Sequence, residues 1–335
     1  MGKERLEALK QRAAILQGLR EFFIREEYLE VETPILSPRL IPESSLEVFS
    51  TEYRRRGGEP VALYLIPSPE LWMKRILAAG VPRIFQLTKC FRNHEEAGPL
   101  HQPEFTMLEW YALQADYLDQ AALLEGLFQY LFRKLEREPL LEFRNRRIDC
   151  HPPFLRLSMQ EAFALNLGLD LARLTGLEEI TACAREREVP VTDQDSWADI
   201  FHKLFLTFVE PGLPAQRPLL LCDYPCGVPT LARKKAGTPW AERWELYLAG
   251  VEVANCYSEE TDGAAVGEFF AREGRRKATA VVPHPADLRF LEIFSAKLPP
   301  CAGVALGVDR LVMAFTGQET IQGVNYFSFV DIFDD

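Results

Sequence analysis

The 335-residue chain contains no run of about 18 consecutive apolar residues, so it lacks the kind of segment that crosses a membrane as a helix. Its first residues, MGKERLEALKQRAAIL, are charged throughout and lack the continuous apolar stretch of a secretory signal. Internal repeats, low-complexity segments and a dividing linker are missing too. We therefore expect a cytoplasmic protein with no membrane partner, whose composition (47% hydrophobic, 26% charged) supports a large core.

Cysteines with the spacing of a zinc site are also missing. The chain has seven cysteines, and only Cys222 and Cys226 lie close together, with Pro225 between them. A zinc site needs a second pair at a matching spacing. We expect reduced thiols and no structural metal.

Basic residues are outnumbered, with 38 Lys and Arg against 49 Asp and Glu, which gives a formal net charge of −11. Because phosphate contacts dominate nucleic-acid affinity, an acidic chain is a poor general binder of nucleic acid. The excess of acidic residues therefore argues against tRNA binding, although the chain can still carry a local basic patch.

Apolar spacing predicts the main elements. Residues 5–28 carry a helical apolar stripe, and Tyr28–Leu36 alternates apolar and charged residues like a strand that Pro34 ends or bends. Ser68-Pro-Glu predicts the start of a helix that runs to about Ala79, with Ser68 able to cap it. Further strands are expected at 61–66, 84–91, 105–111, 219–224, 242–248, 251–255 and 303–308, further helices at 116–136, 264–277 and 309–315, and mainly helix over 158–210.

Phe91–Tyr111 (FRNHEEAGPLHQPEFTMLEWY) is the most informative segment, because it predicts a strand, a loop and a returning strand. Arg92 at the strand end can grip a phosphate, or it can form a surface salt bridge. Phe105 can stack on a purine, or it can belong to the core. Glu109 lies among apolar neighbours, and a buried carboxylate there requires a cationic partner such as a ligand amine.

Two downstream segments complement it. Gly303 and Gly307 allow a ligand to approach the backbone, and Arg310 can cover a purine or pair with Asp309 on the surface. Glu245 and Glu252 flank a turn at residues 249–250. They can reach one face and hold Mg²⁺ on ATP phosphates, or they can be solvent-facing acids.

Together these segments resemble the class II aminoacyl-tRNA synthetases. Residues 91–111 resemble motif 2, residues 303–315 (GVALGVDRLVMAF) resemble motif 3, and LEVETPIL within about 28–36 resembles motif 1. The resemblance spans about residues 5–330. It implies an α+β fold with an antiparallel β-sheet flanked by helices, a single catalytic domain over residues 1–335, and a homodimer built through motif 1.

The segment that corresponds to the amino-acid pocket resembles a particular subgroup of this family. Glu252–Asp262 (EVANCYSEETD) is similar to the pocket segment of lysyl-tRNA synthetases. Because the helix before motif 1 starts near residue 5, we expect no counterpart of their anticodon-binding domain. The chain is thereby similar to the elongation factor P lysine ligase family. That family activates (R)-β-lysine with ATP and transfers it to the ε-amine of a lysine on elongation factor P, releasing AMP. Ala305 agrees, because lysyl-tRNA synthetases have glycine at that place.

The resemblance implies roles for individual residues. Arg92 would hold the α-phosphate and the carboxylate, and Arg310 would cover the adenine opposite Phe105. The implied ATP contacts are Arg92, Asn93, His94, Glu95, Gln102, Phe105, Glu245, Leu246, Gly307 and Arg310, with Glu245 and Glu252 as the Mg²⁺ ligands. The implied substrate contacts are Ser68, Pro69, Glu70, Glu109, Tyr111, Glu252, Asn255, Tyr257, Glu259 and Ala305.

The chain departs from the family pattern in a few places. His94 stands where relatives have glutamate, so Glu95 is expected to take that role. Gln102 replaces an asparagine, and Cys256-Tyr257 replace Gly-Phe. Two rival interpretations stay open: a lysyl-tRNA synthetase-like enzyme that loads α-lysine onto tRNA or a small molecule, and a non-catalytic regulatory paralogue. Ala305 argues against the first, and the retained arginines and paired carboxylates argue against the second.

Overall fold

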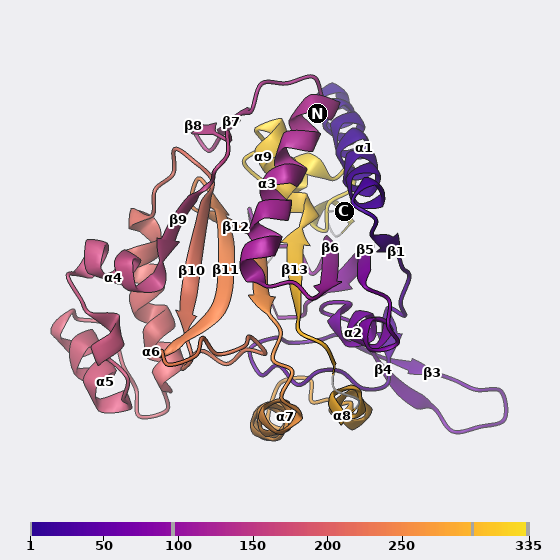
Figure 1. Cartoon of the computed structure of the whole chain (residues 1–335). Coiled ribbons are helices and arrows are strands. Elements are labelled where there is room, and N and C mark those ends of the chain that lie inside the picture. The colour runs from indigo at the N-terminus through magenta and orange to yellow at the C-terminus, as the bar shows by residue number, and fades with distance from the viewer. Residues whose placement is uncertain (1, 95–97, 296–297, 333–335) are drawn as a thin grey trace.

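The computed structural model describes residues 2–94, 98–295 and 298–332, and its centre is a mixed eight-stranded sheet (Figure 1). The strand order is β1-β5-β6-β13-β12-β11-β10-β9, and only the β1–β5 and β9–β10 pairs are parallel. These strands are β1 (Leu29–Glu30), β5 (Arg83–Phe91), β6 (Glu104–Leu113), β9 (Leu155–Ser158), β10 (Leu219–Pro225), β11 (Trp240–Leu248), β12 (Val251–Ser258) and β13 (Cys301–Gly307).

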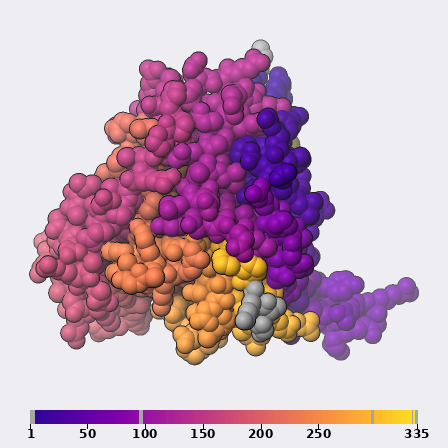
Figure 2. All heavy atoms as spheres, in the orientation of Figure 1, coloured from indigo at the N-terminus to yellow at the C-terminus, as the bar shows by residue number. Residues whose placement is uncertain are grey.

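Two smaller sheets complete the β structure. One has the order β2-β4-β3 and comprises β2 (Leu36–Ser37), β4 (Val61–Leu65) and β3 (Ser50–Tyr53). The β3–β4 hairpin projects from the body of the molecule in Figure 2. The other sheet pairs β7 (Leu140–Phe143) with β8 (Arg146–Asp149).

Helices begin where the sequence supplies caps. Asp116, Ser158 and Ser196 each accept hydrogen bonds from first-turn backbone N–H groups, and the third helical residue bonds back, which forms a capping box. The α-helices are α1 (Gly2–Arg25), α2 (Glu70–Ala78), α3 (Tyr117–Lys134), α4 (Met159–Leu167), α5 (Leu177–Glu186), α6 (Trp197–Leu204), α7 (Gly263–Lys277), α8 (Glu292–Ser295) and α9 (Val308–Thr316). In the described part of the chain, none of them is long and apolar enough to span a bilayer.

The two faces of the central sheet differ in chemistry because successive side chains on a strand point to opposite sides. On β6, Leu108 and Trp110 belong to the main core, whereas Glu109 and Tyr111 line a cavity on the other face. Strand β13 follows the same alternation. Glu109 has apolar neighbours in the sequence because one face of β6 belongs to the main core and the other face lines the polar cavity.

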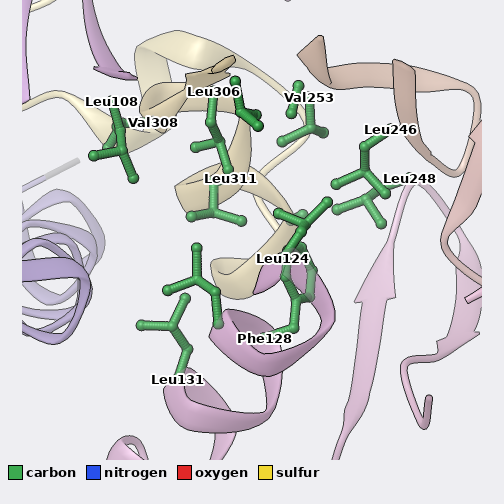
Figure 3. Close-up of a cluster of buried hydrophobic side chains, with 14 of the residues drawn as sticks. Leu108, Leu124, Phe128, Leu131, Leu246, Leu248, Val253, Leu306, Val308 and Leu311 are labelled. Carbon is green, nitrogen blue, oxygen red and sulfur yellow. The ribbon is translucent and has the colours of Figure 1, made fainter. Parts of the chain in front are cut away.

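The main core fills the space between one sheet face and α1, α3 and α9 (Figure 3). Leu124 and Phe128 of α3 and Leu311 of α9 lie against strand residues such as Leu246 and Leu306. A second core joins α4, α5 and α6 to β9 and β10 at the far edge of the sheet. The mainly helical segment expected over 158–210 therefore packs on the same sheet.

Several predicted elements are confirmed and two need correction. Strands β5 and β6 are the antiparallel pair expected around residues 91–111. The strand expected over Tyr28–Leu36 is wrong in extent, because β1 has two residues and Pro34, which lacks an N–H donor, separates it from β2. Ser68 does not cap α2, whose N-cap is Pro69 with no side-chain hydrogen bond.

Candidate active site

A cavity of about 800 Å³ opens on the sheet face opposite the main core. Its wall comes from β6, β11, β12 and β13, from the loop before β3, and from helices α6 and α7. The predicted site residues that line it are Ser68, Glu70, Arg92, Gln102, Phe105, Glu109, Tyr111, Glu252, Asn255, Tyr257, Glu259, Ala305, Gly307 and Arg310. Segments far apart in the sequence thus meet at one surface.

One end of the cavity is an acidic cluster around a buried lysine. Lys74 Nζ lies 2.5 Å from Glu70 Oε1 and 2.5 Å from Glu259 Oε2, and the Lys74 side chain is only 2% exposed. The rings of Tyr111 and Tyr257 flank the ammonium, with centroids 6.0 and 5.5 Å away. The Tyr257 hydroxyl donates to Glu70 Oε1 at 3.2 Å.

Glu109 and Glu43 add two more carboxyl groups to this cluster. The Tyr111 hydroxyl donates to Glu109 Oε2 at 2.9 Å, and Glu43 lines the cavity beside Glu70. Burial and the negative charge of Glu70 raise the pKa of Glu109 well above its usual range and that of Glu43 to about 7. Four carboxyl groups therefore surround a single lysine, and the cluster favours an additional cation.

Glu259 and Lys74 influence each other's ionisation. Burial raises the pKa of Glu259 to about 8, although the Lys74 ammonium opposes that shift. Burial disfavours the charged form of Lys74, but Glu259 and Glu70 outweigh it and raise the pKa of Lys74 above its usual value. Neither Glu259 oxygen accepts a hydrogen bond of good geometry from the described chain, so this carboxyl has unused capacity for a donor.

The other end of the cavity presents arginines and an aromatic ring. The Arg92 guanidinium lies 5.2 Å from the centroid of the Phe105 ring. Arg310 donates from Nη1 to the Glu252 carbonyl at 2.7 Å, and its Nη2 lies 2.8 Å from His101 Nε2. Gln102 is buried at the wall, and its Nε2 donates to no group in the described part of the chain. Cations, a flat ring and a free amide donor suit a nucleotide.

Glu245 and Glu252 come together through an irregularity in the β11–β12 hairpin. The predicted tight turn is confirmed, because β11 and β12 pair directly across Ala249 and Gly250, which have φ of 47° and 77°. A bulge then makes Leu246 pair with Ala254 but Tyr247 with Glu252. The extra residue reverses the alternation, so Glu252 emerges on the cavity face that Asn255 also shares.

The two glutamates have different surroundings. Glu245 is buried, and its oxygens accept from Arg243 Nη2 at 2.6 Å, from the Tyr247 hydroxyl at 2.9 Å and from the Tyr224 hydroxyl. Glu252 faces the cavity with 41% of its side chain exposed. Its position deep in the cleft, together with the adjacent Glu245 charge, raises its pKa to about 7. A second cation near Glu252 would relieve that repulsion.

Some predicted residues lie outside the cavity wall. Asn93 Oδ1 accepts from the His94 backbone N–H, and its Nδ2 reaches the Val48 carbonyl at 3.4 Å, so this side chain fastens a loop. The residues that do not line the cavity are Pro69, Asn93, His94, Glu245 and Leu246, of which Leu246 is in the main core. Glu95 lies outside the described residues.

The profile of the class II tRNA synthetase family (D, K and N) matches residues 1–330. The chain belongs to this family. The α+β architecture with a large sheet flanked by helices agrees with it. Members of the family are ATP-dependent ligases that activate amino acids and use Mg²⁺. The predicted fold class is therefore confirmed.

The cavity fits the Mg²⁺ that this family uses. Magnesium in nucleotide sites is held by one or two carboxylates together with phosphate oxygens, so a dedicated protein cage is not required. Within the described residues, no group of three His, Cys, Asp or Glu side chains could hold a metal alone. Glu252, which faces the cavity, would hold the ion, and the ion would neutralise charge on the ATP phosphates. Glu245, the other predicted ligand, would have to exchange its contacts with Arg243, Tyr247 and Tyr224 to join it.

Two charged residues of the site were missed by sequence reasoning. Lys74 follows Glu70 by four residues on a predicted helix, and this ion-pair spacing was readable. Arg243 precedes Glu245 by two residues on a predicted strand, which places both side chains on one face. Asp199 and His202 of α6 also line the cavity, and their sequence neighbourhood carries no signal that we recognise.

Proposed function

We propose that the protein activates a lysine-like amino acid, (R)-β-lysine, with ATP and transfers it to the ε-amine of a lysine on elongation factor P. The observation that carries this proposal is the acidic cluster of Glu43, Glu70, Glu109 and Glu259 around Lys74. A buried excess of carboxyl groups selects an organic cation over a neutral or acidic side chain.

The substrate also needs an apolar stem between its charged ends. Tyr257 and Tyr111 line the wall beside the cluster, and their rings suit the methylene groups of a lysine-like chain. Ala305 lies between Glu109 and Asn255 in the sheet register and lines the cavity, so it adjoins two of the proposed substrate contacts. A single methyl group matters in a close-packed pocket, and the resemblance to the β-lysine ligases, which have alanine at this place, supports β-lysine over α-lysine.

The chemistry of the first step follows from the opposite end. The carboxylate of the amino acid attacks the α-phosphorus of ATP, the bond to the β-phosphate oxygen breaks, and pyrophosphate leaves. The carboxylate is already ionised at neutral pH, so no general base is required. Arg92 and Arg310 neutralise the developing charge, and the cavity holds the reactants in line.

In the second step, the neutral acceptor amine attacks the carbonyl carbon of the adenylate, an amide bond forms, AMP leaves, and the amine gives up a proton to solvent. The resemblance to the elongation factor P lysine ligases supports a protein lysine as the acceptor. The net charge of −11 supports an acceptor other than a polyanionic tRNA.

We also propose a homodimer built through motif 1. The segment around β2 exposes Leu29, Ile35 and Leu36, each at more than 40% of its surface, and Tyr53 of the adjacent hairpin is 55% exposed. These exposed apolar side chains are available for burial against a second copy of the chain. Sedimentation at micromolar concentration tests this, and a monomer alone would contradict the proposal.

An exchange assay tests the activation step. Purified protein, ATP and labelled pyrophosphate are incubated with (R)-β-lysine, α-lysine, ornithine, arginine or norleucine, and labelled ATP is measured. We expect the strongest exchange with (R)-β-lysine and none above background with norleucine, which has no distal ammonium. Equal exchange with norleucine would overturn the role of the acidic cluster.

A further inference from the structure

Lys74 does not line the cavity although it contacts two residues that do. It lies on α2 behind Glu70 and Glu259, with 2% of its side chain exposed. It therefore cannot contact an amino acid in the cavity directly. Any effect of Lys74 on the substrate acts through the two carboxylates.

The contacts divide the oxygen atoms of these carboxylates into two sets. Lys74 Nζ and the Tyr257 hydroxyl both donate to Glu70 Oε1, and Lys74 Nζ forms an ion pair with Glu259 Oε2. Within the described part of the chain, neither Glu259 oxygen accepts a hydrogen bond of good geometry, and Oε1 is buried without the ion pair that Oε2 has. A buried carboxylate oxygen without a donor indicates a place for a ligand donor.

We propose that Lys74 is a positioning residue for the substrate ammonium: it binds one oxygen of Glu70 and one of Glu259 from behind, and leaves the second oxygen of each for the incoming amine. The inference rests on the proposed function. It assigns the substrate cation to a place between two carboxylates that already share an internal cation, so that positive and negative charges alternate through the cluster.

Without Lys74, the two neighbouring carboxyl groups would lack a counter-ion in a buried site. Like charges that close together cannot both remain ionised without a counter-ion. A proton would take the place of the ammonium, and the protonated carboxyl would bind the substrate amine weakly. The other titratable groups facing this site are Glu43, Glu109, Tyr111, Tyr257, Cys256 and Cys301, and none of them supplies a positive charge.

The test is Lys74→Met in the pyrophosphate exchange assay, with the KM for the amino acid and the KM for ATP measured separately. We expect the amino-acid KM to rise on the order of 100-fold, because losing an adjacent ammonium raises a buried carboxyl pKa by about two units. The ATP KM should stay within about threefold of the wild-type value. The fall of the amino-acid KM with rising pH should move to a higher pH range in the variant than in the wild-type protein, because the carboxyl ionises later without the ammonium.

Three further variants separate positioning from general damage. Lys74→Arg retains the charge and should recover part of the affinity. Lys235→Met removes a partly buried lysine that pairs with Asp223 away from the cavity, and it should leave both KM values unchanged. Glu259→Gln combined with Lys74→Met removes the unpaired buried charge and protects folding. Its amino-acid KM should rise by less than the product of the two single effects, because Lys74 acts in part through Glu259.

The outcomes are distinguishable. An unchanged amino-acid KM in Lys74→Met, a parallel rise of the ATP KM, or additive effects in the double variant would overturn the role of Lys74. Absence of exchange by the wild-type protein with every diamino acid would instead overturn the proposed function.

Discussion

Arg12 of α1 and Asp309 of α9 form an ion pair of 2.8 Å, with side chains only 10% and 3% exposed. Arg12 Nη2 also donates to Thr106 Oγ1 at 2.9 Å, and the Thr106 backbone N–H donates to Asp309 Oδ2 at 2.7 Å. Three segments meet here beside two proposed ATP contacts, because Thr106 follows Phe105 and Asp309 precedes Arg310. The pair fixes the helix that carries Arg310 against the strand that carries Phe105.

Replacement of Arg12 should destabilise the fold strongly. In Arg12→Met, the Asp309 carboxylate loses its buried partner, and breaking such a pair costs about 3–5 kcal/mol. Urea unfolding followed by circular dichroism measures the loss. Lys134→Met is the control, because its pair with Glu21 is solvent-screened and should contribute little to stability. Equal effects of the two substitutions would contradict this account.

Gly303 should tolerate no side chain. A Cβ atom there would lie 2.1 Å from Tyr111 Cε1 and 3.0 Å from Glu259 Oε1. Gly303→Ala should therefore displace the Tyr111 ring, raise the amino-acid KM and reduce the free energy of unfolding by about 1–3 kcal/mol. Gly267→Ala on α7, where a Cβ meets nothing within 4 Å, is the matched control. A wild-type amino-acid KM in Gly303→Ala would show that this contact does not shape the site.

Arg310→Ala should reduce adenylate formation by a factor of about 100 to 1,000, the usual effect of removing one group that stabilises developing charge. Single-turnover formation of the adenylate measures it. Arg173→Ala, which removes an exposed arginine with an exposed aspartate partner, should leave the rate unchanged. Arg310→Ala with near-wild-type activity would remove Arg310 from the proposed site.

Substrate affinity should depend on pH through Glu259. The folded-state pKa of this carboxyl is about 8, and a substrate ammonium favours the ionised form. The amino-acid KM should therefore fall as the pH rises from about 6 to about 8.5, with the distal ammonium, whose pKa is about 10.4, still charged. Calorimetry in two buffers should detect proton release on binding. A KM that rises over this range would refute the assignment.

The same shift has a consequence for stability. The folded-state pKa of Glu259 is raised above the unfolded value of about 4.3. Its contribution to stability is therefore fully present below pH 4.3 and decreases as the pH rises through about 8. Glu259→Gln should abolish this decrease, and urea unfolding at pH 6 and pH 8.5 measures it.

The sequence was sufficient for the parts of the site that follow from local periodicity. Alternation along β6 places Glu109 and Tyr111 on one face, and two glycines in β13 keep that face open. The order of the motifs, which resembles that of the synthetase family, predicted that Arg92 and Arg310 lie at one site. The order and pairing of the central strands then brought these segments together.

Other features depend on long-range packing that a local pattern does not encode. The bulge that turns Glu252 toward the cavity requires the register of two paired strands. Arg12 and Asp309 are 297 positions apart in the sequence, and both form hydrogen bonds with Thr106. The position of α6 at the cavity edge depends on the second core, in which Ile200 and Phe201 pack.

The most direct test of the account is an intact-mass measurement of elongation factor P after incubation with this protein, ATP and either (R)-β-lysine or α-lysine. We expect a mass gain of one β-lysyl group, formed much faster than the α-lysyl product and lost when the acceptor lysine is replaced. AMP formation with an unchanged mass of elongation factor P would contradict the proposed acceptor.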